Sequence, residues 1–127
     1  MALAATVNLE HGEIASINWT IAADLTNKKV VWTVAATAQG TRLLRKASDT
    51  GGVTISQSTP TGIGSVTILE ADFTSIPHVD GNIVDGIPAT RYYYSLWYED
   101  SSGGSNPVHT AFGFLIVKGT VPRAANP

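Results

Sequence analysis

The chain has 127 residues, a formal net charge of −2 at pH 7 and no cysteine. This length predicts one domain that buries a sizeable core. The absence of cysteine excludes disulfides, thiolate nucleophiles and cysteine metal ligands, and the balanced charge without a basic block argues against nucleic acid or a membrane as partner. Only 14% of the residues are charged, compared with about a quarter in an average domain, which predicts a polar but largely uncharged surface.

The N-terminal sequence MALAATVNLEHGE begins with small apolar residues. It lacks the basic region and the long apolar run of a secretory signal, and no later run has the roughly 18 apolar residues of a membrane-spanning helix. We therefore expect a protein that is made in the cytoplasm. Residues 1–6 are predicted to be an N-terminal arm, residues 7–121 the folded domain and residues 122–127 a C-terminal tail, because both ends lack a strand pattern.

Apolar residues alternate with polar ones in segment after segment, which predicts strands. The segment Thr41 to Lys46 (TRLLRK) is expected to be an edge strand, since basic side chains discourage pairing with another chain. Leu69 to Ile76 is expected to form a single helical turn that ends before Pro77. The alternating residues are Ile17, Trp19, Ile21, Val30, Trp32, Val34, Ala36, Val53, Ile55, Val66 and Ile68.

The segment RYYYSLWYED, residues 91–100, contains all four tyrosines of the chain. Because side chains alternate along a strand, Tyr93, Ser95 and Trp97 share one face. The opposite face carries Tyr92, Tyr94, Leu96 and Tyr98. A glycine-rich connection leads to a second alternating run over residues 108–116, which predicts a hairpin. Both faces of the first strand carry aromatic residues. The face that does not meet the core must therefore be covered by other residues of the same chain or by another chain.

Large aromatic and apolar residues of these strands are expected to fill the core. This predicted core set is Trp19, Trp32, Tyr94, Leu96, Phe112 and Phe114. For the opposite face of the tyrosine strand we favour a contact with another protein, since tyrosine and tryptophan are enriched at the centres of interfaces. Stacking of a sugar on these rings is the alternative. The candidate interface, including residues at the N-terminal end, is Tyr93, Trp97, Met1, Leu3 and Val7.

Motifs for catalysis or cofactor binding are absent from the sequence. His11, His78 and His109 lack the spacing of a zinc site. The segment DGNIVDG, residues 80–86, departs from the register of a calcium loop and is better explained as a turn. The Gly62-Ile63-Gly64 segment is followed by a predicted strand, whereas a nucleotide-binding loop precedes a helix. We therefore expect no enzymatic activity, no metal and no cofactor.

The order of these segments resembles the immunoglobulin-like domain typified by the N-terminal part of baseplate upper proteins of tailed phages. The resemblance covers about residues 7–121. The matching features are the Gly12 turn, the Asp24-Leu25-Thr26 lead into the strand Val30 to Thr37, the strand Val53-Thr54-Ile55, the turn Leu69 to Ile76, and Tyr94 followed by the turn Asp100 to Gly103. The implied fold is an all-β, immunoglobulin-like antiparallel β-sandwich of about 7–8 strands with extended N- and C-terminal arms.

The resemblance implies a building block of the virion with no catalytic residues. Baseplate upper proteins continue into a long C-terminal region, whereas this sequence stops at Pro127, so a capsid decoration or cement protein is an equal expectation to a tail or baseplate component. The expected partners are other virion proteins, with self-association possible, and the expected location is the virion. The alternative function is a carbohydrate-binding module for adsorption to the host.

Overall fold

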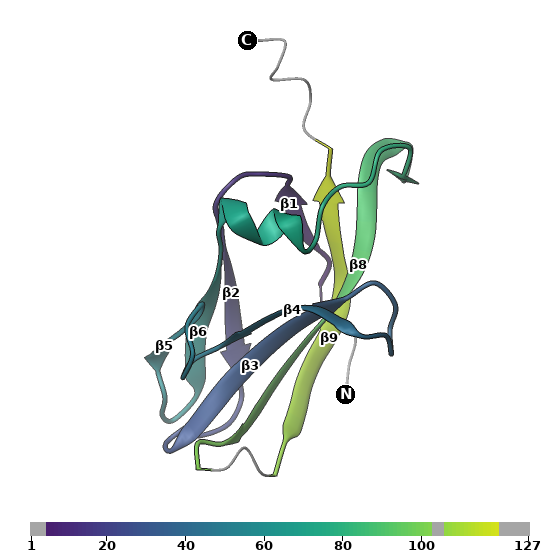
Figure 1. Cartoon of the computed structure of the whole chain (residues 1–127). Coiled ribbons are helices and arrows are strands. Elements are labelled where there is room, and N and C mark those ends of the chain that lie inside the picture. The colour runs from purple at the N-terminus through teal and green to yellow at the C-terminus, as the bar shows by residue number, and fades with distance from the viewer. Residues whose placement is uncertain (1–4, 103–105, 120–127) are drawn as a thin grey trace.

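The computed structural model describes residues 5–102 and 106–119. Within these residues the chain forms nine strands and one short 3-10 helix, arranged in two facing sheets (Figure 1). The all-β prediction is confirmed. The elements are β1 (Val7–Glu10), β2 (Ala15–Ile21), β3 (Lys28–Ala35), β4 (Arg42–Ala47), β5 (Val53–Gln57), β6 (Gly62–Ile68), η1 (Glu70–Thr74), β7 (Ile83–Val84), β8 (Ile87–Asp100) and β9 (Val108–Lys118).

The larger sheet has the strand order β1-β9-β8-β3-β4, and the two-residue strand β7 pairs with β8. The smaller sheet has the order β2-β6-β5. The predicted edge strand, the helical turn and the hairpin of β8 with β9 are all present. The expectation of a purely antiparallel fold is wrong, because β1 pairs in parallel with β9. These two strands lie at opposite ends of the sequence, so no connecting turn could have revealed their direction.

The core lies between the two sheets and is built from the inward-facing residues of both. Four residues of the predicted core set, Trp19, Trp32, Tyr94 and Leu96, are buried in this cluster. Burial raises the pKa of the Tyr94 hydroxyl above its usual value, so the group stays protonated at neutral pH and donates a hydrogen bond of 2.9 Å to the carbonyl of Ala5. The first described residue of the predicted arm is thus attached to the core.

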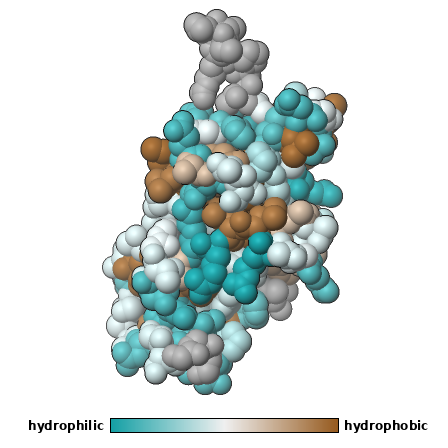
Figure 2. Space-filling model, in the orientation of Figure 1, coloured by the Kyte–Doolittle hydropathy of each residue, from teal (hydrophilic) through white to brown (hydrophobic). Residues whose placement is uncertain are grey.

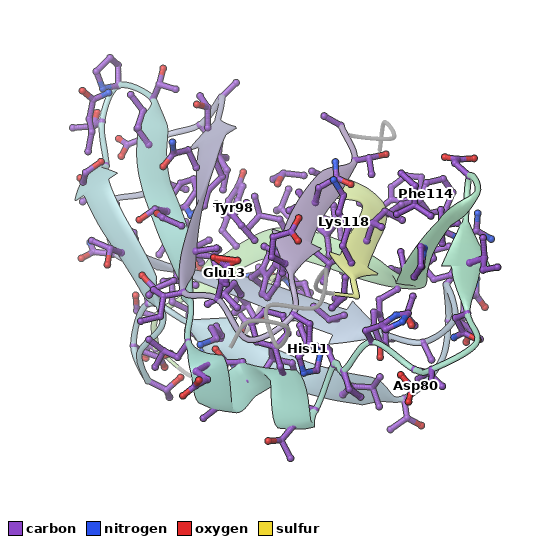
Figure 3. The ribbon with its side chains drawn as sticks, turned by 90° about the horizontal axis from the view of Figure 1, so that it is seen from above. His11, Glu13, Asp80, Tyr98, Phe114 and Lys118 are labelled. Carbon is purple, nitrogen blue, oxygen red and sulfur yellow. The ribbon has the colours of Figure 1, made fainter. Side chains whose placement is uncertain are left out.

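Two aromatic residues of the predicted core set lie elsewhere. Phe112 and Phe114 are paired with Ser95 and Tyr93, and directly paired residues share one face of a sheet. Both are half-buried and lie outside the core cluster. Figure 3 places Phe114 on the side of β9 that faces away from the smaller sheet. The core is filled instead by Leu115 and Val117, because both faces of β9 are apolar and only the register with β8 decides which one points inward.

The glycines of β6 make room for large core residues. Gly64 is paired with Trp19, and a Cβ atom on Gly64 would lie 2.4 Å from the Trp19 ring and 2.1 Å from the Thr54 carbonyl oxygen. A Cβ atom on Gly62 would lie 2.2 Å from the side chain of Leu25. The Gly-Ile-Gly segment is thus a packing feature of a strand, as expected where another group approaches the backbone closely.

We expect Gly64→Ala to destabilise the domain by about 1–3 kcal/mol or more, because the added methyl group overpacks the site against a backbone oxygen that cannot rotate away. The free energy of unfolding from denaturant titration measures the effect. Ser65→Ala is the matched control, since Ser65 is the next residue of the same strand and is only half-buried. Equal stability of the two variants would contradict this account of Gly64.

The connection between the two sheets after β6 is held by polar contacts. Asp72 of η1 accepts a hydrogen bond of 2.7 Å from the Leu69 backbone N–H and forms an ion pair of 2.6 Å with Lys46 of β4. Further along, the Tyr92 hydroxyl donates to the Pro77 carbonyl. Burial raises the pKa of Tyr92 as well, which keeps this donor protonated. The helical turn η1 is therefore attached to β4, and the segment after it is attached to β8.

Candidate functional site

The face of the larger sheet that points away from the smaller sheet carries the aromatic residues that the core does not use. We call it the outer face. Pairing across β3, β8 and β9 arranges its residues in rows. One row contains Val31, Trp97 and His109, the next Thr33, Ser95 and Phe112, the third Ala35, Tyr93 and Phe114, and the last Arg91 and Ile116.

The aromatic side chains of the outer face pack in two groups. Tyr93 and Phe114 meet edge to face, with ring centroids 5.3 Å apart, and the guanidinium of Arg91 lies 4.8 Å from the Phe114 centroid and 5.9 Å from that of Tyr93. Trp97 and His109 have centroids 5.2 Å apart at an angle of 41°. Because the rings are tilted and Arg91 lies over two of them, the outer face offers an uneven, cationic and aromatic surface rather than a flat platform.

Small residues between these groups leave a hollow of about 370 Å³, which we call the outer groove. Thr33, Ala35 and Ser95 are among its lining residues, and the β3–β4 connection and the aromatic rings supply the others. Its volume falls within the range of about 300–1,000 Å³ that ligand pockets occupy. The complete lining is Thr33, Ala35, Thr37, Ala38, Gln39, Gly40, Arg42, Tyr93, Tyr94, Ser95, His109 and Phe112.

A second hollow of about 550 Å³ adjoins the outer groove, and the two share Thr37 and Tyr93. Its lining includes Ile83, Val84 and Asp85 from the hairpin of β7 and β8, which projects from the body in Figure 1. In the view of Figure 2 the surface is mostly hydrophilic, with apolar atoms in a few small patches. The two hollows together form an extended trough beside the hairpin.

The basic residues differ in how they are neutralised. Each of the four lysines, all within the described part of the chain, forms an ion pair: Lys28 with Asp100, Lys29 with Asp49 and Glu99, Lys46 with Asp72, and Lys118 with Glu10. By contrast, no ion pair with a described carboxylate is found for Arg42, Arg45 or Arg91. Arg42 lines the outer groove, and Arg91 lines the second hollow.

The structure separates the predicted interface residues. Tyr93 lines the outer groove, and Trp97 lies beside it in contact with His109. Val7 lies in β1, where it is partly buried and packs against the core. Met1 and Leu3 lie outside the described residues. Sequence reasoning missed Arg42, Phe112 and Phe114 as members of this surface. For the two phenylalanines, the available signal was that both faces of β9 are apolar.

The three histidines do not all stand singly. The ring Nδ1 of His11 accepts a hydrogen bond of 2.9 Å from the His78 backbone N–H, and the His78 ring lies 3.1 Å from the Thr90 hydroxyl. This contact joins the turn after β1 to the segment before β7, far from His109 in the outer groove. Among the described residues, no group of three potential metal ligands converges, and no helix is long and apolar enough to cross a membrane.

Comparisons with known proteins add no relative. No protein-family model matches the chain, and no curated protein shows a significant match.

Proposed function

We propose that this protein is a non-enzymatic structural component of a bacteriophage particle, a capsid decoration or tail component that docks on other virion proteins through its outer face. The observation that carries the proposal is that the outer face presents Tyr93, Phe112 and Arg42 around an open groove, and that no described carboxylate forms an ion pair with Arg42. Tyrosine, phenylalanine and arginine are enriched at the centres of protein interfaces. A surface of this composition suits a protein partner better than nucleic acid or a membrane, which would require a broad basic or apolar surface.

The strand order supports an immunoglobulin-like sandwich as the finer description of the fold. In that fold strands A, B, E and D form one sheet and C, F and G form the other. In this chain β1, the first strand, pairs with β9 of the larger sheet instead. Here β2-β6-β5 match B, E and D in order, and β3, β8 and β9 match C, F and G. The strand β4 extends the second sheet as in variable-type domains.

Two features of the core also support an immunoglobulin-like fold. The immunoglobulin fold has a buried tryptophan on strand C and a tyrosine on strand F whose hydroxyl bonds back to the chain upstream. Trp32 on β3 is buried against Tyr94, with centroids 6.3 Å apart. Tyr92 on β8 donates its hydroxyl proton to the carbonyl of Pro77, 15 residues upstream, which is a longer span than the few residues of the immunoglobulin tyrosine corner. Tyr94 stands two residues after Tyr92, the spacing at which antibody domains have their second disulfide cysteine, and this chain has no cysteine.

The test is to express the chain in cells infected by a phage that encodes it and to measure its copies on separated heads and tails. We expect the double variant Tyr93→Ser and Phe112→Ser to stay folded but to lose most of its incorporation, because both ring contacts at the groove are removed. Ile63→Ser is the matched control, since Ile63 is an apolar residue with 40% exposure on the smaller sheet. Absence of the wild-type chain from particles would refute the structural role, and equal incorporation of the two variants would refute the outer face.

Carbohydrate binding is the second candidate function, favoured by one observation. The outer groove combines aromatic Tyr93 and Phe112 with the hydroxyls of Thr33, Thr37 and Ser95, and such mixtures of apolar rings and polar groups are typical of small-ligand sites. Binding of a soluble glycan by the isolated domain, lost on Trp97→Ala while folding is retained, would favour this role. However, the Arg91 guanidinium lies over the Tyr93 and Phe114 rings, where a sugar would have to stack. This position favours contact with a protein over binding of a sugar.

A further inference from the structure

We propose that the outer groove binds an extended segment of the partner protein in which an aspartate or glutamate lies next to an apolar residue, with Arg42 as the group that receives the carboxylate. The inference rests on the proposed docking function and specifies the chemistry of the partner. It follows from the charges, the shape and the aromatic packing of the trough.

The charge distribution identifies the carboxylate. Among the residues that the structure describes, no aspartate or glutamate lines the outer groove, and Arg42 is the one arginine or lysine there. The four lysines all have carboxylate partners in the described chain, whereas no ion pair is found for Arg42. A guanidinium binds carboxylates with two parallel hydrogen bonds, which lysine cannot do, and thus suits this recognition. The neighbouring Gln39 amide and Thr37 hydroxyl supply further hydrogen-bond donors.

The shape of the trough favours an extended chain over a single small anion. The outer groove, whose lining is mainly apolar, adjoins the mainly polar second hollow at Thr37 and Tyr93. In the second hollow Asp85 lies among the same lining residues as Arg91, so that region has charges of both signs. A segment that lies along the trough would therefore place its carboxylate at Arg42 and an adjacent apolar side chain against Tyr93 and Phe112.

Aromatic packing argues against an acidic glycan as the occupant. Sugars bind on an exposed aromatic ring face, but the Tyr93 and Phe114 rings meet at 65° and have the Arg91 guanidinium over them. A second copy of the chain, bound through the same face, would bring the arginines of both outer faces together, which like-charge repulsion disfavours. A peptide segment with a carboxylate avoids both problems.

The experiment uses the full chain and a yeast-displayed library of random short peptides as the probe. Peptides selected by the protein should contain aspartate or glutamate beside an aliphatic or aromatic residue. For a selected synthetic peptide, replacing the acid with its amide should weaken binding at least about tenfold, the effect of one lost charged hydrogen bond. Fluorescence anisotropy measures the dissociation constants.

Arg42→Met and Arg45→Met form a matched pair, because both arginines are exposed residues of β4. Arg45 is paired with Thr33 and so shares the outer face, but of the two arginines only Arg42 lines the outer groove. With Arg42→Met the acidic peptide and its amide should bind equally weakly, whereas Arg45→Met should behave like the wild type. The inference would be overturned by any of three results. These are the selection of peptides without an acidic residue, an equal loss of peptide affinity in both variants, and binding of uronic-acid oligosaccharides in place of peptides. Particle incorporation is measured separately, so acidic peptides selected by a chain absent from particles would refute the virion role alone.

Discussion

Trp32→Ala is expected to destabilise the domain by about 3–5 kcal/mol, enough to unfold much of the population at 25 °C if the total stability is near the low end of about 5–15 kcal/mol. The side chain has 1% exposure and lies between the two sheets against Tyr94. Truncation to alanine removes the buried ring and leaves a cavity that the strands on both sides cannot close without breaking their register. Denaturant titration followed by near-ultraviolet circular dichroism gives the free energy of unfolding.

Two variants control for this result. Trp97→Ala makes the same substitution on the outer face, where the ring is half-buried, and should cost only about 1 kcal/mol. Trp32→Phe should cost clearly less than Trp32→Ala, because it keeps most of the volume and removes an indole N–H that is buried without a hydrogen-bond partner. A Trp32→Ala variant as stable as Trp97→Ala would mean that Trp32 is not a core residue.

Asp72→Ala is expected to cost about 3 kcal/mol, because it leaves the ammonium group of Lys46 buried without its partner. The two side chains have relative exposures of 15% and 9%, and their charged atoms lie 2.6 Å apart. The same substitution also removes the acceptor of the Leu69 N–H at the start of η1, and the loss of a cap contributes about 1 kcal/mol in general. Thermal and denaturant unfolding of the purified variant measure the total.

The double variant Lys46→Met with Asp72→Ala provides the decisive comparison. The apolar carbons of the Lys46 side chain pack near Gly52. Methionine has a similar apolar side chain but carries no charge. If the unpaired charge is the main cost, the double variant will be more stable than Asp72→Ala alone. A double variant less stable than Asp72→Ala would show that packing and capping, rather than charge burial, dominate at this position.

The sequence predicted those parts of the fold that depend on neighbouring residues. The hairpin of β8 and β9 follows from alternation on both sides of a glycine-rich turn, and η1 follows from the short segment before Pro77. The inward face of β8 was predictable too, since Tyr92, Tyr94 and Leu96 all lie in the core. The parallel pairing of β1 with β9 was not predictable, because it joins segments over 100 residues apart with no local signal.

The candidate site was predictable only in part. Tyr93 and Trp97 stand out because they lie opposite the core-facing residues of one strand. Arg42 is recognisable as an edge-strand charge, but its place at the groove depends on the path of the β3–β4 connection. Phe112 and Phe114 were assigned to the wrong side, since an extra residue in β9 near Leu96 shifts the pairing and both faces of the strand are apolar.

Alternation and turn chemistry are local properties, so they predict an all-β domain with more aromatic residues than one core face can hold. Tertiary structure decided which aromatic residues fill the core and which surround the outer groove. That choice depends on strand register and sheet order, which are set by the combined packing of distant segments. The same packing brings Arg42 from β4 and Tyr93 from β8 to one groove, where their chemistry can act together.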